Sequence, residues 1–307
     1  MKIDYVSFGL ILDNIHFPNG KEIPSVLGGG GPQVVFGMRL WSKYVGFVGQ
    51  VGSDLPVEIL SWFDQSGIDR QGLRIGNQPT LRAVQNLDID GNRTQTWISD
   101  PAVRQEYLSL AMKRIPQIYQ HAKIYHLGLH PDDWENNLDL IQYLKELGAL
   151  VSIELFKPAD KPLSTQRLQA LLRSADLFSL NQWEAYSLIG KKTNQELIQT
   201  FIDNGGKLIS LRLGSQGSLV ANGPTGQEFY IPVYPVTVVD PIGAGNAFCG
   251  GFAVGWEETK DLRKAGLYGS VASSIVVEQI GVPVVTPEVI QIAEKRLNQL
   301  DHYSNQN

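Results

Sequence analysis

Short and nearly continuous apolar runs recur along the chain, and segments with the apolar spacing of helices separate them. Such runs are typical of parallel strands that are buried on both faces of a sheet. We expect strands at residues 3–12, 44–52, 122–129, 149–155, 175–181, 207–214 and 234–240. We expect helices at residues 33–43, 56–67, 136–148, 164–175, 183–190 and 246–258. Because strands and helices alternate, the pattern predicts an α/β fold with a doubly wound, mainly parallel sheet.

Two stretches depart from this alternation and predict β-hairpins. Residues 80–99 alternate polar and apolar side chains and carry a turn signal at Asp90-Gly91. Residues 12–27 predict a second strand pair around the turn sequence PNGK. Together the hairpins predict a small, half-exposed sheet, which is either a lid over a pocket or a surface excursion without that role. We expect a single domain over residues 1–307, with the lid strands inserted in it.

Composition and charge narrow the classes of function. The chain has 307 residues, a formal net charge of −5 and no basic run, which argues against nucleic acids and membranes as partners. No apolar run reaches the roughly 18 residues that a membrane span needs. The chain contains one cysteine, Cys249, so it cannot form an internal disulfide, and residues 1–15 lack the pattern of a cleaved signal. These features predict a cytoplasmic location.

The stretch VVDPIGAGNAFCGGF, residues 238–252, joins a predicted strand to a predicted helix through a glycine-rich loop. Glycines let backbone N–H groups approach an anion closely, and a helix N-terminus adds partial positive charge. Charge that develops on a transferred phosphoryl group would be stabilised there. The same sequence is also compatible with an ordinary strand-to-helix turn.

A series of motifs in chain order resembles those of the ribokinase-like family, also called PfkB carbohydrate kinases, over nearly the whole chain. GLILDNI resembles a first strand that ends in a substrate-binding aspartate, and GGGGPQVVFGMRLW resembles the first signature. SLNQWEAYSLIG resembles the Asn-x-x-Glu motif, and LRLGSQGSLV resembles a Gly-x-x-Gly turn at the nucleotide site. DPIGAGNAFCGGF resembles the second signature, Asp-Thr-x-Gly-Ala-Gly-Asp, and residues 261–283 resemble the helix that flanks the adenine.

The resemblance implies a role for each motif residue. Substrate binding would fall to Asp13, Gly28, Gly29 and Gln33, and nucleotide binding to Asn181, Glu184, Gly214, Gly217 and Ser270. Glu184 would act on Mg²⁺ through water, and the anion hole would consist of Gly243, Ala244 and Gly245. The residues also permit plainer interpretations: Asp13 as a surface aspartate, Glu184 as a solvated helix residue, and Gly214 with Gly217 as a hairpin turn.

The chain departs from the family where the chemistry takes place. Asn246 occupies the position of the aspartate that accepts the proton of the attacking hydroxyl, and an amide has no useful basicity at neutral pH. Pro241 replaces a threonine, Gln33 an asparagine and Glu154 an aspartate. The sequence is similar to a divergent branch, including fungal proteins of unclear activity, whose second signature ends in Asn. Asp13 and Glu154 are candidates for a substitute base.

Other polar residues carry no comparable signal. Asp240 is expected to cap the loop by accepting hydrogen bonds from its N–H groups. Cys249 is expected to be a core residue of the helix. His126 and His130 lie on a predicted strand and the loop after it, where their spacing does not make them converge, so we expect no metal site there.

Two hypotheses remain. The first is an ATP-dependent kinase that acts on a hydroxyl of a small sugar or nucleoside, with chemistry impaired by Asn246. The second is a protein on a kinase scaffold that binds a nucleotide or sugar without catalysis. The resemblance implies ATP and Mg²⁺, with a monovalent cation as a further cofactor, and a homodimer through the lid.

If Asn246 removes the base and nothing replaces it, restoring the carboxylate should restore the rate. Asn246→Asp should then raise phosphoryl transfer to a panel of pentoses and hexoses by about tenfold or more, since a positioned base contributes roughly 10²–10⁴-fold. The assay is ATP-dependent product formation. An unchanged rate, with ATP still bound, would indicate either a different base or a binding protein.

Overall fold

A nine-stranded sheet forms the centre of the computed structural model, which describes residues 2–89, 93–113 and 115–304. Its order is β13 (Gln227–Ile231), β12 (Ser218–Asn222), β11 (Leu208–Arg212), β10 (Leu177–Asn181), β9 (Leu150–Leu155), β8 (Ile124–Leu129), β1 (Tyr5–Phe8), β4 (Val45–Val51) and β5 (Asp69–Ile75). The strands from β11 to β5 are parallel, and β12 and β13 continue the sheet in antiparallel fashion. The expected mainly parallel sheet is confirmed.

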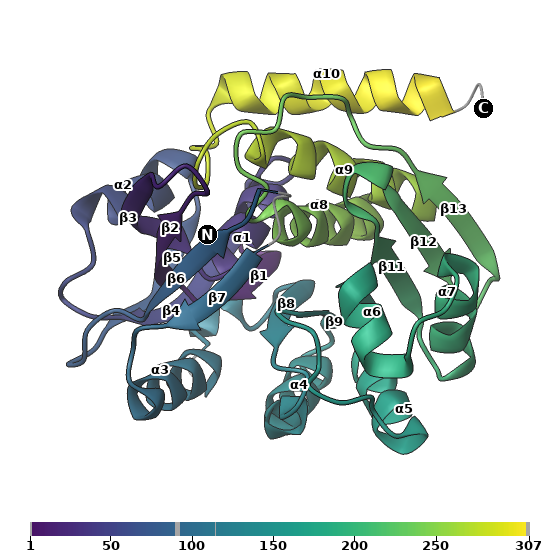
Figure 1. Ribbon diagram of the computed structural model, residues 1–307, viewed down its shortest axis with the longest axis horizontal. Helices are drawn as coiled ribbons and strands as arrows, with labels where there is room; N and C mark the ends of the chain where they lie inside the picture. Colours follow the sequence, from purple (N-terminus) through teal and green to yellow (C-terminus); the bar gives the residue numbers. More distant parts are fainter. Residues whose placement is uncertain (1, 90–92, 114, 305–307) are drawn as a thin grey trace.

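Helices cover both faces of this sheet (Figure 1). One face carries α1 (Gly31–Arg39), α2 (Val57–Ser66), α8 (Ala244–Thr259), α9 (Leu262–Val276) and α10 (Pro287–Ser304). The other face carries α4 (Leu138–Glu146), α5 (Thr165–Ser174), α6 (Gln182–Ile189) and α7 (Asn194–Asp203), with the short turns η1 (Gln117–Tyr119) and η2 (Trp134–Asn137). Each face of the sheet packs against its helices in a separate hydrophobic core. Successive residues along a strand contribute to one core and then the other, as a sheet buried on both faces requires.

A second, four-stranded sheet lies beside the first, in the order β3 (Glu22–Gly28), β2 (Ile11–His16), β6 (Arg82–Leu87) and β7 (Arg93–Trp97). Its strands are those of the two predicted hairpins, and α3 (Pro101–Lys113) packs against it through the buried Tyr107. The turn predicted at Asp90-Gly91 lies outside the described residues.

The run at residues 3–12 does not form the single strand that we expected. Gly9 has a φ of +83°, a left-handed conformation that glycine adopts readily, and the chain turns there. Residues before the turn form β1 in the large sheet, and residues after it form β2 in the small sheet. Asp13 therefore belongs to the small sheet and does not end the first strand of the large one.

The strand predicted at residues 234–240 is also wrong. Residues 232–239 have no regular secondary structure, and Pro232 and Pro235 have no N–H with which to join a ladder. Val238 and Val239 are 58% and 49% exposed, so their apolar character does not mark a buried strand. Apolar composition alone misled the prediction here.

The topology places a crevice at the C-terminal ends of the central strands. The chain leaves β1 toward β4 and β5 on one side and returns to β8, β9 and β10 on the other. In open α/β sheets this reversal creates the crevice where ligands bind. No helix in the described part of the chain is long and apolar enough to cross a bilayer.

Helices α1 and α8 pack closely because both carry glycine at their contact. A Cβ atom on Gly37 would overlap the carbonyl oxygen of Ala247, and one on Gly250 would overlap that of Val34. The two backbones therefore touch without intervening side chains. This contact sets the relative position of the two helices, whose N-termini face the same crevice.

Gly250→Ala should separate these helices and lower the free energy of unfolding by about 1–3 kcal/mol, the usual cost of overpacking. Urea denaturation followed by circular dichroism measures the change. Gly128→Ala is the control, because a Cβ there would meet only Phe156, at 3.9 Å. Equal stability of the two variants would contradict the close contact between α1 and α8.

Candidate active site

A cavity of about 310 Å³ lies at the C-terminal ends of β1, β8, β9 and β10. The small sheet forms one wall through Asp13, Gln85 and Trp97, and the start of α8 forms another through Gly243, Gly245 and Asn246. The glycine segment before α1 lies between them. The cavity thus brings together most of the residues for which the resemblance implies a role.

The loop before α8 is built as the sequence suggested. Asp240 is buried, and its carboxylate accepts hydrogen bonds from the N–H groups of Ile242, at 2.9 Å, and Gly281, at 3.5 Å. Gly243 caps the helix with a φ of +87°, and no side chain caps the helix in its place. The Ala244 N–H donates to the Pro241 carbonyl at 3.3 Å. The next residues of the first turn, Gly245 and Asn246, line the cavity, and no side chain caps the helix there, as an anion site requires.

Asn246 and Glu154 form the central contact of the cavity. The Asn246 side-chain amide donates to Glu154 Oε1 at 2.5 Å, although the two residues are 92 positions apart. Gly30, the N-cap of α1, lies against the pair. A Cβ atom added to Gly30 would be 3.0 Å from Asn246 Nδ2 and 3.8 Å from Glu154 Oε1. The carboxylate thus lies near the N-termini of both α1 and α8, which favour negative charge.

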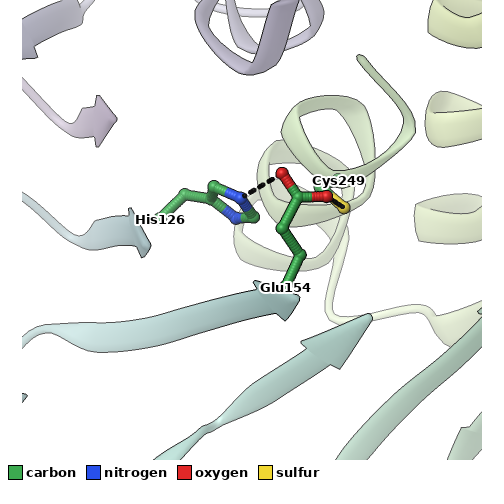
Figure 2. Close-up of side chains that lie close together, drawn as sticks. All are labelled: His126, Glu154 and Cys249. Atoms are coloured by element: carbon green, nitrogen blue, oxygen red, sulfur yellow. Dashed lines mark hydrogen bonds and ion pairs between the residues drawn. The ribbon is translucent and has the colours of Figure 1, made fainter. Parts of the chain in front are cut away.

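Glu154 has further partners that keep it ionised although it is only 3% exposed. His126 Nε2 is 3.2 Å from Oε1, the Cys249 thiol donates to Oε2 at 3.2 Å, and Arg212 Nη1 is 3.5 Å from Oε2. Figure 2 shows the histidine and the thiol on either side of the carboxylate. Burial alone would raise the pKa of Glu154, but its contacts with His126, Arg212 and Asn246 outweigh burial and lower the pKa to about 2.

His126, Glu154 and Cys249 offer nitrogen, oxygen and sulfur atoms within 4.8 Å of one another, a donor set of the kind that zinc binds. The surrounding charges oppose this use. The Arg212 guanidinium and the Asn246 amide both direct N–H groups at Glu154, where a dication would have to lie. Burial and the nearby carboxylate also raise the pKa of the Cys249 thiol, which disfavours the thiolate. We assign the cluster to the support of the carboxylate.

Arg212 is the main residue that the sequence analysis missed. It ends β11 and is 12% exposed, and its guanidinium lies between Glu154 and Glu184, 3.4 Å from Glu184 Oε2. A Cβ on Gly245 would overlap Arg212 Nη1, so the guanidinium lies directly beside the start of α8. A charged residue at the end of the apolar strand LISLR was the signal that could have revealed it.

Asn181 and Glu184 form a capping box at the start of α6. Asn181 accepts a hydrogen bond from the Glu184 N–H at 2.9 Å, and Glu184 Oε2 accepts one from the Asn181 N–H at 2.7 Å. Glu184 is buried and lines the cavity, so the solvated helix glutamate considered above is wrong. Because its oxygens already accept hydrogen bonds from Asn181, a cation would contact Glu184 most readily through water.

The substrate side of the cavity is rich in hydrogen-bonding side chains. Asp13 is 3% exposed, which rules out a surface aspartate, and its Oδ1 accepts from Gln85 Nε2 at 2.7 Å. Among the described residues, the buried amide oxygens of Gln33 and Gln85 have no hydrogen-bond partner. Gly28 lies directly against Asp13, where a Cβ would overlap Oδ2, and Gly29 lines the cavity. Donors on a polyhydroxylated molecule would satisfy these acceptors.

Five of the predicted residues do not line this cavity: Gly28, which lies against Asp13, and Ala244, Gly214, Gly217 and Ser270. Gly214 and Gly217 form the turn between β11 and β12, around η3 (Gly214–Gln216), as the hairpin alternative supposed. The hydroxyl of Ser270 donates to the Pro232 carbonyl at 2.6 Å, and Ala244 begins α8. Their roles in binding nucleotide or phosphate remain predictions. Cys249 is buried on α8, as expected. His130 Nδ1 lies near Asp132 and Asp133, whereas His126 contacts Glu154 and Ser152.

Comparison with known proteins places these features in a family. The model of the pfkB family carbohydrate kinases matches residues 4–288. The cytidine kinase of Thermococcus kodakarensis is 26% identical over 283 residues, which cover 91% of this chain and 98% of that protein. An Arabidopsis thaliana ribokinase complexed with ribose and ATP superposes with a TM-score of 0.72 at 22% identity, over 97% of this chain and 99% of that one. The Escherichia coli protein designated ribokinase II, in complex with ATP and Mg²⁺, superposes with a TM-score of 0.73 at 17% identity, over 97% of this chain and 99% of that one.

Removing the Arg212 charge should destabilise the protein strongly. Arg212→Gln leaves two buried carboxylates without their cation, and breaking a buried pair in this way costs about 3–5 kcal/mol. Arg70→Gln is the control, since the Arg70–Asp64 pair is 40% and 58% exposed and exposed pairs contribute little to stability. Urea denaturation measures both variants, and a loss at Arg212 no larger than that at Arg70 would contradict the buried position of its guanidinium.

Proposed function

This chain belongs to the pfkB family of carbohydrate kinases, and on that basis we propose that it transfers the terminal phosphoryl group of ATP to a hydroxyl of a small sugar or nucleoside. The observation that carries the proposal is the cavity itself. The acceptors around Asp13 and the first turn of α8 line the same cavity, so a hydroxylated substrate bound at the former would lie near an anion site at the latter.

The start of α8 would stabilise the charge of the transferred group. Gly245 and Asn246, in the first turn of α8, line the cavity, and the Arg212 guanidinium lies beside Gly245. Phosphoryl transfer depends largely on positioning and electrostatic stabilisation, which donors fixed before the reaction supply at little cost. Arg212 is held in place by Glu154 and Glu184, so its charge would be available without rearrangement.

The residues near Glu184 fit a hydrated Mg²⁺. Carboxylate and amide oxygens are its preferred protein ligands, and it usually keeps several waters, which suits a carboxylate already engaged by Asn181. When bound, Mg²⁺ would offset negative charge on the phosphates of ATP. The proposal also includes a monovalent cation as a further cofactor, a homodimer that forms through the small sheet, and a cytoplasmic location.

The aromatic residues in the cavity lining favour a nucleoside over a free sugar. Asp13 and Gln85 would bind the hydroxyls of a pentose in either case. Phe8, Trp97 and Phe156 line the same cavity, and their rings offer faces on which a base can stack. The similarity to a cytidine kinase supports this choice, and the similarity to a ribokinase complexed with ribose keeps pentoses in the test.

Asn246 favours the second candidate, a protein that binds nucleotide or sugar without catalysis. An amide at this position cannot accept the proton of the attacking hydroxyl. In that case the same walls would still bind their ligands, and the arrangement around α8 would serve recognition alone.

Ligand binding and turnover separate the two candidates. The kinase proposal predicts that millimolar ATP with Mg²⁺ raises the melting temperature, because a ligand that binds only the folded state stabilises it. It also predicts ATP-dependent phosphorylation of at least one member of a panel of nucleosides, pentoses and hexoses. A shift in melting temperature without turnover would favour the binding protein, and no shift at all would contradict both candidates.

A further inference from the structure

We infer that Glu154 accepts the proton of the attacking hydroxyl in this protein, in place of the residue at position 246. The inference rests on the proposed kinase function and adds the residue that would complete it. It answers the question posed by Asn246, because the cavity that contains an amide at the family's base position also contains a carboxylate beside it.

Geometry is the first support. Glu154 Oε1 lies 2.5 Å from Asn246 Nδ2, so a carboxylate oxygen is available within one hydrogen bond of the position that the resemblance assigns to the base. Both residues line the cavity, beside the anion site at the start of α8. Gly30 has no side chain to separate the pair from the substrate side.

The surrounding groups keep this carboxylate ionised and oriented. Arg212 faces it from β11, His126 from β8, and Asn246 and Cys249 from α8, so these three elements each contribute a donor or a titratable group. From α1, Gly30 contributes only its backbone. His126 is in turn held by Ser152, whose Oγ lies 2.9 Å from Nδ1. We assign His126 as a positioning residue, since it contacts the carboxylate and would not need to contact substrate.

A strongly ionised carboxylate is a weak base, and the reaction tolerates that. In a loose transition state the attacking oxygen needs little activation, and its proton becomes acidic only as the new bond forms. The oxygen–phosphorus bond to substrate would form while the bond between the γ-phosphorus and ADP breaks. The proton of the hydroxyl would pass to Glu154 and then to solvent through the cavity, and no oxidant or reductant is involved.

The inference predicts a defect in rate without a defect in ATP binding. Glu154→Gln should lower kcat about 100-fold or more, the usual loss for a positioned base, while the shift in melting temperature with ATP and Mg²⁺ persists. Glu135→Gln is the matched control, since Glu135 pairs with Arg167 outside the cavity and should keep full activity. Circular dichroism shows whether each variant folds, and Glu154→Asp, which keeps the charge, should retain more activity than Glu154→Gln.

A second pair of variants tests which side of the hydrogen bond carries the base. In the wild-type background, Asn246→Asp should bring no gain, because it replaces the amide donor with a like charge beside Glu154. In the Glu154→Gln background, the same change should recover activity about tenfold, because a carboxylate returns at the neighbouring position.

The outcomes are distinguishable. An active wild type with an unimpaired Glu154→Gln variant overturns the inference and leaves the kinase function standing. A gain of about tenfold from Asn246→Asp alone would also overturn it, because that result means that the base is missing. A wild type without turnover on the whole panel overturns the kinase function and the inference together.

Discussion

The hydrogen bond between Asn246 and Glu154 is the contact on which the rest of the site depends. It joins the end of β9 to the first turn of α8, and the sequence separates its partners by 92 positions. A buried carboxylate needs compensation, and His126, Cys249 and Arg212 all gather around it to provide this. Arg212 then bridges to Glu184 and so links the nucleotide side of the proposed site to the substrate side.

This arrangement is possible because two helices approach unusually closely. Gly37 and Gly250 let the backbones of α1 and α8 touch, and both helices then direct their N-termini at one carboxylate. Two partial positive charges at the same point favour an anion there, whether it is Glu154 or a phosphate next to it. The packing of the core and the electrostatics of the cavity therefore follow from the same small residues.

The sequence predicted those features that are local. Apolar runs and helical spacing were sufficient for β1, β4 and β8 to β11 of the large sheet, and turn signals were sufficient for the two hairpins and the cap formed by Asp240. Strands β5, β12 and β13 of the large sheet were not predicted. The break at Gly9 and the irregular course of residues 232–239 were missed, since a turn and two prolines override apolar composition there. Arg212 escaped notice because its partners lie on other strands, and contacts of that kind do not show in one chain's local pattern.

Asn246 first suggested a kinase fold that had lost its base, and the structure instead shows a carboxylate held beside the amide. The most direct test of the account is a crystal structure with ADP, aluminium fluoride and the substrate that the activity panel identifies. We expect the attacking hydroxyl within hydrogen-bonding distance of Glu154, with the fluoride group at the start of α8 beside Arg212. A hydroxyl that contacts Asp13 alone, with Glu154 out of reach, would contradict the account.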